Sequence, residues 1–272
     1  MEEYSDLYEP EDGDDFASDA VEQEARDHLR RFFDQNRDKV FFSRQIEVQN
    51  EKLYFHWITN RAIHDLEAEG IIKSEVQKLP RAGSIKLVWH RGFRYYKKAA
   101  KRIIGIVDEY ANPNISENIG LHGEIMVLEA FARFQFLTHG RAMNRFRDRI
   151  WMESAHNLDF VFERDGVAYG VEVKNTLGYM DHNEFVLKIR MCEHLNLRPL
   201  FVVRMFPKSW TYELIRAGGF ALILEYQLYP WTHRELARRI SAELGLPIDA
   251  PRAIKDGTIQ RFLNWHNKQL KM

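Results

Sequence analysis

Two strand-like segments, residues 157–162 and 169–174, flank an Asp165-Gly166 pair, and together they most constrain how this chain can fold. Both segments alternate apolar with polar positions and are rich in β-branched and aromatic residues. An Asp-Gly pair between such segments is the strongest short signal for a hairpin with a two-residue turn. The register of that hairpin places Asp159 directly opposite Glu172. The sequence therefore predicts two carboxylates side by side on one face of a sheet.

Such a carboxylate pair needs a compensating positive charge, because opposite side chains have Cβ atoms about 4.5–5.5 Å apart and like charges there destabilise a sheet. A divalent cation with oxygen ligands would offset the repulsion; Mg2+ is the expected ion, with room left beside Gly170. The face predicted to hold this chemistry comprises Asn157, Asp159, Gly170, Glu172 and Lys174. The opposite, apolar face is predicted to comprise Leu158, Phe160, Phe162, Tyr169, Val171 and Val173. Alternatively, Glu172 and Lys174 are ordinary solvated strand residues, since a Glu-x-Lys triplet is common by chance.

The charge of the chain is divided unevenly along its length. The first nineteen residues contain nine carboxylates and no lysine or arginine, so residues 1–20 are expected to form a solvated, disordered tail. The alternative is that this tail competes with a polyanion for the basic body. The whole chain has 40 acidic and 39 basic residues, so removing nine carboxylates leaves 31 acidic residues and a net charge of about +8. A basic body favours a polyanionic partner.

Cysteine content and hydropathy indicate the cellular compartment in which the chain is expected to occur. Cys192 is the single cysteine, which excludes an intramolecular disulfide or a cysteine-cluster zinc site and fits a reducing cytosol. The acidic N-terminus does not resemble a signal peptide, and no apolar run approaches the roughly twenty residues that span a bilayer. We therefore expect a soluble, cytoplasmic protein without a membrane partner.

The N-terminal part of the chain, residues 21–90, is predicted to form three helices followed by two strands at 72–79 and 84–89. Together with the segment LEAEGII at 66–72, this order resembles a winged helix-turn-helix domain. The resemblance implies a third helix in the DNA major groove; winged helices also serve as protein-interaction modules, and that role stays open. The residues that the resemblance places against DNA are His56, Thr59, Asn60, Arg61 and His64 on the helix and Lys78, Arg81 and Lys86 on the wing.

A basic helix is predicted within residues 91–114, and its end is the expected domain boundary. Its positive charge suits sequence-independent phosphate contacts, although a solvated surface helix explains the same pattern equally well. The basic residues are Arg94, Lys97, Lys98, Lys101 and Arg102.

Glu124 falls inside the apolar stripe of the next predicted helix, 121–137. A carboxylate in such a position is costly unless it has a partner, so we predict that it belongs to a metal site; the alternative is a marginal position from which it reaches solvent or Arg145. The apolar face of this helix is predicted to comprise Leu121, Ile125, Leu128, Phe131 and Ala132. Further along, Asp181 and Glu184 have the spacing of a reciprocal helix cap and need no catalytic role.

Helices and strands after this point alternate, with strands predicted at 199–205 and 220–224 around a helix at 209–217. Over residues 115–229 this order, with Asp159, the triplet Glu172-Val173-Lys174 and Glu124, resembles the PD-(D/E)XK nuclease superfamily. The Gly123-Glu124 helix is similar to the opening helix of archaeal Holliday junction resolvases, and Leu158 stands where the family often has proline. The expected fold class is α/β, a restriction-endonuclease-like mixed sheet flanked by helices and preceded by the winged helix-turn-helix. Residues 230–272 are predicted to add helices with no packing partner specified.

The resemblance implies that Asp159, Glu172 and the carbonyl of Val173 bind Mg2+, which Mn2+ can replace, with Glu124 completing or supporting the site. Lys174 would position or activate the attacking water. Lys188 would either contact the scissile phosphate or simply face solvent.

The predicted function is a Mg2+-dependent DNA endonuclease whose winged helix docks on DNA. The alternative is a DNA-binding regulator or scaffold with a catalytically inert nuclease fold. One or two metal ions, and a homodimer, are left open.

Overall fold

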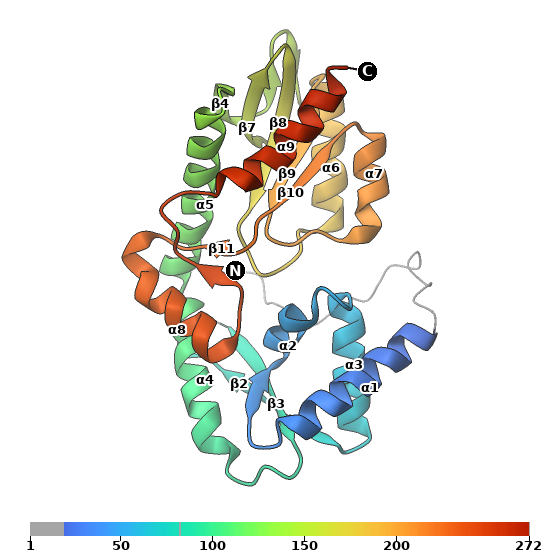
Figure 1. Cartoon of the computed structure of the whole chain (residues 1–272), viewed down its shortest axis with the longest axis vertical. Helices are drawn as coiled ribbons and strands as arrows, with labels where there is room; N and C mark the ends of the chain where they lie inside the picture. The colour runs from blue at the N-terminus through green and yellow to red at the C-terminus, as the bar shows by residue number, and fades with distance from the viewer. Residues whose placement is uncertain (1–18, 82, 272) are drawn as a thin grey trace. The chain divides into compact units, whose positions relative to one another are not determined.

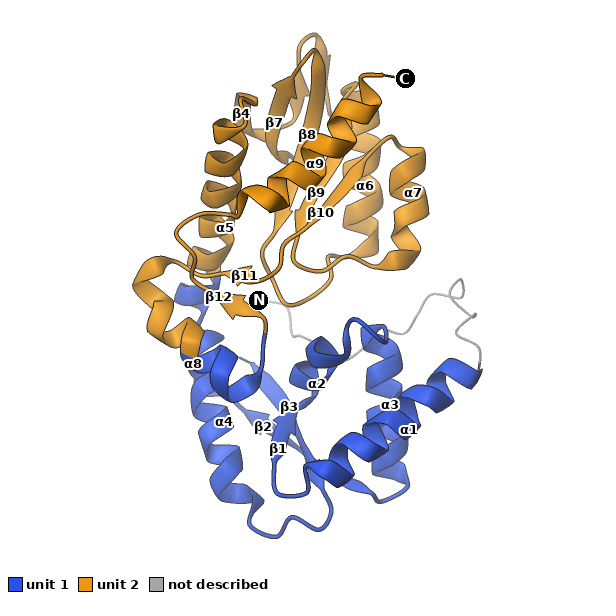
Figure 2. Cartoon of the chain, viewed as in Figure 1, with its two compact units in different colours: residues 1–116, 239–246 blue, residues 117–238, 247–272 orange. Residues whose placement is uncertain are grey.

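The computed structural model describes residues 19–81 and 83–271, which form a mixed α/β protein (Figure 1). The chain divides into two compact units: unit 1 holds residues 1–116 and 239–246, and unit 2 holds 117–238 and 247–272 (Figure 2). The predicted acidic tail lies outside the described residues except for its last two positions, which begin α1 (Asp19–Gln35). No helix in the described part of the chain is long and apolar enough to cross a membrane.

Unit 1 is built from helices packed on a small antiparallel sheet with the strand order β1-β3-β2. Its core is apolar, with Leu29, Ile46, Ile63 and Val88 fully buried together. Gly70 has a φ of 67°, a left-handed conformation that suits glycine and ends the third helix. After α1 the elements are β1 (Val40–Phe42), α2 (Ser43–Asn50), α3 (His56–Ala68), β2 (Ile72–Lys78), β3 (Ser84–His90) and α4 (Tyr96–Tyr110).

Unit 2 contains a five-stranded mixed sheet with the order β10-β9-β8-β7-β4. The pairs β10–β9 and β9–β8 are parallel, whereas β8–β7 and β7–β4 are antiparallel. Its main elements are α5 (Pro113–Arg133), β4 (Leu137–Met143), β7 (Leu158–Arg164), β8 (Val167–Lys174), α6 (His182–His194), β9 (Arg198–Val203), α7 (Thr211–Arg216), β10 (Phe220–Ile223), α8 (Arg234–Leu244) and α9 (Asp256–Gln269). The last part of α8 belongs to unit 1.

Helices cover both faces of the five-stranded sheet (Figure 1). On one face, α5 and α9 contribute Phe131 and Phe262 to a core with Phe162 and Val171. On the other face, α6 and α7 pack against β9 through Phe185, Leu214 and Phe201. The parallel connections β8-α6-β9 and β9-α7-β10 place their helices on the same face, as right-handed crossovers do. The sheet is therefore buried from both sides, and functional side chains must reach solvent at its ends.

The predicted hairpin is confirmed in its turn and register. Asp165 and Gly166 have φ angles of 52° and 76°, as a tight two-residue turn requires. Arg164 faces Val167, and the pairing continues without a shift as far as Phe160. Asp159 is the next residue along the strand.

The predicted division of faces is wrong at Leu158, and the room predicted beside Gly170 is not there. Leu158 packs in the cluster on the α6 side with Cys192 and not beside Phe160. The pairing of β7 with β8 ends at Phe160, although β4 still pairs with Leu158 through Met143. Gly170 does not leave room for a cation. A Cβ atom there would lie 2.5 Å from Cys192 Sγ and 2.8 Å from Leu158 Cδ1. The glycine instead lets α6 approach the sheet closely.

The buried face of α5 also differs from the predicted one. Leu121, Ile125 and Ala132 are exposed, whereas Met126 and Val127 point into the core. Apolar residues occur around most of this helix, so their spacing does not select a face, and packing against the sheet decides it. The predicted helical stretch also ran too far, since Leu137 begins the edge strand β4, whose segment contains Gly140 and lacks regular alternation.

Candidate active site

Asp159 lies at the start of β7 and is tied directly to β8. Its Oδ2 atom accepts a hydrogen bond of 2.7 Å from the backbone N–H of Val173. Burial raises the pKa of Asp159, and the nearby charge of Glu124 adds to this rise, while the Val173 N–H opposes it. The side chain thus bridges the two strands where their regular pairing ends, which holds its carboxylate beside β8.

Glu172 is a buried carboxylate, only 4 % exposed. Its Oε2 atom accepts a hydrogen bond of 2.5 Å from Lys188 Nζ, and its Oε1 atom lies 3.5 Å from Lys174 Nζ. Burial and then the negative charge of Asp159 raise the pKa of Glu172 to about 7, even though both lysines lower it. The two carboxylates therefore interact as the predicted cross-strand neighbours would.

Lys188 is buried in this site, so the prediction that it faces solvent is wrong. Besides Glu172, its ammonium group donates a hydrogen bond of 2.5 Å to the backbone carbonyl of Asn157. The connection from β8 into α6 lays this helix along the sheet, which turns Lys188 inward over Glu172. A charged lysine this deeply buried is tolerated only because an acidic partner compensates its charge.

Lys174 is held by Glu184, a residue that was predicted only to cap α6. Asp181 does cap α6, since its Oδ1 atom accepts a hydrogen bond of 3.1 Å from the Glu184 N–H. The Glu184 carboxylate does not return the cap but accepts a hydrogen bond of 2.9 Å from Lys174 Nζ. Burial lowers the pKa of Lys174, but the bond to Glu184 and the charge of Glu172 outweigh burial, so the net shift is upward. Lys174 is therefore kept as a cation.

Glu124 approaches the site from α5 and is partly exposed. It accepts a hydrogen bond of 2.8 Å from Arg141 Nη2 on β4, so it reaches a basic residue as the alternative expected, with Arg141 in the place suggested for Arg145. The negative charge of Glu124 nevertheless raises the pKa of Asp159. Glu124 thus lies close enough to act on the site electrostatically, while its carboxylate binds an arginine.

Asn175 is a buried residue that the sequence pattern did not single out. Its amide group donates to the carbonyls of Ile119 and Leu228 at 2.9 and 2.7 Å. Its Oδ1 atom accepts a hydrogen bond of 2.7 Å from the Leu228 N–H. A Cβ atom on Gly123 would lie 2.7 Å from the Asn175 Cβ, so α5 passes against this side chain. Asn175 therefore fixes the end of β8 to the helix that carries Glu124.

The oxygen atoms in this cluster are of the type that binds a hard cation, but the side chains are not arranged as a complete metal site. Asp159, Glu172 and the carbonyl of Val173 supply oxygen atoms, the ligand type that Mg2+ prefers. Within residues 19–81 and 83–271, no three His, Cys, Asp or Glu side chains converge so as to hold a metal ion. Glu124 would have to leave Arg141 to join the two carboxylates.

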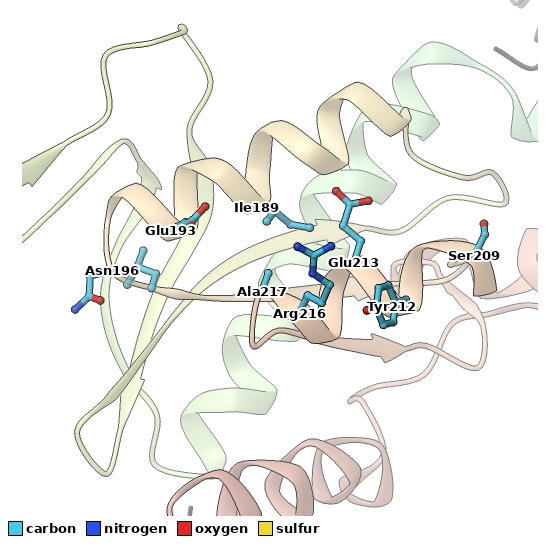
Figure 3. A pocket seen from close by; sticks show the side chains of 9 residues that line it. Ile189, Glu193, Asn196, Ser209, Tyr212, Glu213, Arg216 and Ala217 are labelled. Carbon is cyan, nitrogen blue, oxygen red and sulfur yellow. The ribbon is translucent and has the colours of Figure 1, made fainter. Parts of the chain in front are cut away.

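A separate groove of about 750 Å3 lies between α6 and α7 (Figure 3). Glu193, Glu213, Tyr212 and Arg216 are among its lining residues. None of the carboxylates and lysines described above lines this groove. The cluster of carboxylates and lysines at the start of β7, the end of β8 and on α6 is therefore separate from this groove.

The residues predicted to contact DNA lie in different environments within unit 1. Thr59 is fully buried, and burial with the charge of Arg44 lowers the pKa of His56 to about 3. Both residues are therefore wrongly predicted as exposed DNA contacts; Thr59 shares the core side of α3 with Ile63.

The remaining DNA-contact residues are more accessible. Arg61 pairs with Glu22 at 2.7 Å, and Lys86 pairs with Glu67 at 2.9 Å. Those that lie at least partly exposed are Asn60, Arg61, His64, Lys78, Arg81 and Lys86. Several of these positive charges are thus already balanced by acidic neighbours.

No family model, curated protein or solved structure matches this chain. What the chain does must therefore be inferred from its own side chains. Five of them lie together at one end of the unit 2 sheet: Asp159, Glu172, Lys174, Glu184 and Lys188.

Proposed function

We propose that unit 2 is a Mg2+-dependent endonuclease of the PD-(D/E)XK type that hydrolyses DNA phosphodiester bonds. One observation carries this proposal: the partly buried Asp159 and the buried Glu172 both have raised pKa values and lie beside Lys174, which is held as a cation. Perturbed carboxylates beside a positioned lysine are typical of hydrolytic sites. The five-stranded mixed sheet between helical layers supports the same assignment.

The residues of the site divide the work of hydrolysis. Asp159, Glu172 and the Val173 carbonyl would hold Mg2+, which supplies an activated water and neutralises charge on the phosphoryl group. Glu184 and Glu172 orient the Lys174 ammonium, whose N–H groups can hydrogen-bond the attacking water or a phosphate oxygen. Lys188 on α6 donates a hydrogen bond to the Glu172 carboxylate and so fixes its orientation.

DNA is the substrate class that the rest of the chain supports. The body without its acidic tail carries about eight more basic than acidic residues. Within unit 1, α1, α2 and α3 accompany a sheet with the strand order β1-β3-β2, an arrangement that suits a winged helix-turn-helix. Arg61, His64 and Lys78 are exposed on its third helix and its hairpin, where DNA would be contacted.

Metal binding and cleavage test the proposal together. We expect the full chain to cut plasmid, branched or single-stranded DNA only when Mg2+ or Mn2+ is added. At pH 8, Mg2+ at one hundred times its Kd should stabilise the chain by about 2.7 kcal/mol. This corresponds to a rise in Tm of about 5–10 °C for a unit of this size. Glu172→Gln should remove the metal-dependent rise.

The rival function, a DNA-binding regulator with an inert fold, predicts another result. In that case Mg2+ leaves the Tm of the wild type unchanged, no DNA is cut, and DNA binding is still observed. This outcome would contradict the nuclease proposal.

Glu184→Ala should lower kcat by about tenfold to a hundredfold with little change in KM, because Lys174 would lose the carboxylate that orients it. Glu184→Gln, which keeps a hydrogen-bond acceptor, should recover part of this loss. Glu193→Ala is the matched control, since Glu193 is an exposed carboxylate on the same helix. Equal rates for the two alanine variants would show that Glu184 has no positioning role.

A further inference from the structure

An arginine-rich hairpin follows the edge strand β4 and precedes Asp159 in the chain. It consists of β5 (Arg145–Phe146) and β6 (Arg149–Ile150), joined by a turn at Arg147. Residues 139–150 contain four arginines and one aspartate. The three arginines of the hairpin are exposed. This is a concentration of positive charge outside the catalytic cluster.

The base of the hairpin is firmly anchored. Trp151 N–H donates a hydrogen bond of 2.7 Å to the Asn144 carbonyl, which closes the hairpin. Phe146 and Trp151 are buried in the cluster that contains Leu158. Arg149 donates a hydrogen bond of 2.9 Å to the carbonyl of His194 at the end of α6. The arginines are therefore displayed on a fixed support.

The backbone around the hairpin contains two residues in a left-handed conformation. Ala142 and Arg147 have φ angles of 49° and 53°, in the left-handed region that L-residues rarely occupy. β4 also shifts register between Thr138 and Gly140. Strained backbone of this kind concentrates at functional positions. An arginine at the turn, where glycine would fit more easily, points to a role for its side chain.

The charges of the hairpin are available to a ligand. Arg145 is exposed, and within the described part of the chain its guanidinium makes no side-chain hydrogen bond or ion pair, whereas its backbone pairs with Ile150. Arg147 lies 3.4 Å from Glu163, but its side chain remains 60 % exposed. Guanidinium groups free to form paired hydrogen bonds favour phosphate oxygens.

The position of the hairpin relative to the site follows from β7. Glu163, which Arg147 contacts, is four residues beyond Asp159 on this strand. Four residues at about 3.3 Å each span roughly 13 Å. Stacked nucleotides rise about 3.4 Å each, so this distance corresponds to about four base steps. A nucleic acid bound at Asp159 can therefore reach the hairpin.

We infer that the β5–β6 hairpin binds the phosphate backbone of a nucleic acid through Arg145 and Arg147, about four nucleotides from the bond that is cut. This inference rests on the proposed nuclease function of the same unit. It assigns to the hairpin the role of holding the nucleic acid across the site, through contacts that are independent of base sequence.

Binding of a 30-base-pair duplex to the Asp159→Asn chain in EDTA, measured by fluorescence anisotropy over a range of salt, tests the inference. Adding Arg145→Gln and Arg147→Gln should weaken binding about tenfold and reduce the slope of log K against log salt by about 1–2, since each phosphate contact contributes about 0.9. The matched control is Lys208→Gln with Lys268→Gln, which removes two exposed charges elsewhere in unit 2. Thermal unfolding of each variant checks that it is folded.

Equal affinity and slope for the hairpin variant and its parent would overturn the inference, as would an equal loss in the control. The test separates this failure from failure of the nuclease function. If the wild type cuts DNA while the hairpin variant binds like its parent, only the hairpin inference is wrong. If no DNA is cut but the hairpin variant loses salt-dependent binding, the nuclease function is wrong and the hairpin still binds nucleic acid.

Discussion

Asp159→Asn is expected to reduce Mg2+-dependent cleavage by about a thousandfold or more. The amide oxygen of asparagine can still accept the hydrogen bond from the Val173 N–H, so the strand geometry is retained. The negative charge that would hold the metal ion is lost. Losing a single preorganised electrostatic contact typically costs a rate factor of about 10²–10³, and a metal ligand also affects occupancy. Single-turnover cleavage at saturating Mg2+ measures the effect.

Asp165→Asn provides the control for this change. Asp165 lies in the turn of the same hairpin, is exposed, and has a left-handed backbone that asparagine tolerates. It should cut at nearly the wild-type rate. Lys174→Met should be impaired to an extent similar to Asp159→Asn, because both act on the same step. Wild-type cleavage by Asp159→Asn or by Lys174→Met would show that the site lies elsewhere.

Lys188→Met is expected to have the largest effect on stability. It leaves the buried Glu172 carboxylate without the ammonium group that lies 2.5 Å from it. Removing one member of a buried ion pair typically costs about 3–5 kcal/mol. Urea unfolding at pH 8 should show this loss. Adding Glu172→Gln should restore most of it, because no uncompensated charge is then buried.

The loss of stability caused by Lys188→Met should depend on pH, and the sign of this dependence follows from the pKa of Glu172. The pKa of Glu172 is raised from 4.5 to about 7, so protonation of this carboxyl favours the folded state. The resulting contribution is complete below about pH 4.5 and is lost as pH rises through about 7. This rise in pKa sets a limit of about 3 kcal/mol on the contribution, since each pKa unit corresponds to about 1.4 kcal/mol. The cost of Lys188→Met should therefore shrink between pH 8 and pH 5; a constant cost would contradict the coupling.

The parts of the site that were predicted correctly depend on local signals. A two-residue Asp-Gly turn fixes the pairing of its own strands, so the hairpin register could be read from adjacent residues. That register places Asp159 beside the strand of Glu172 and Lys174. The cap of α6 by Asp181 is local in the same way, because both groups lie within one helical turn.

The parts that were missed depend on contacts between distant segments. The partners of Lys188 and of Glu184 are set by how closely α6 packs on β8, which Gly170 permits. The face of α5 that is buried depends on the sheet it meets, and its own sequence is apolar nearly all round. Such choices are made by tertiary packing rather than by periodicity.

Asn175 has a consequence for how unit 2 can be divided. Two of its three side-chain hydrogen bonds are made to Leu228, and the third reaches Ile119. A fragment that ended before residue 228 would expose a polar group next to Lys174 and would also lack the core residues of α9, such as Phe262. The smallest portion of the chain able to retain this cluster of side chains therefore extends to its C-terminal helix, so residues beyond the last strand of the sheet are an integral part of unit 2 and not an appendage.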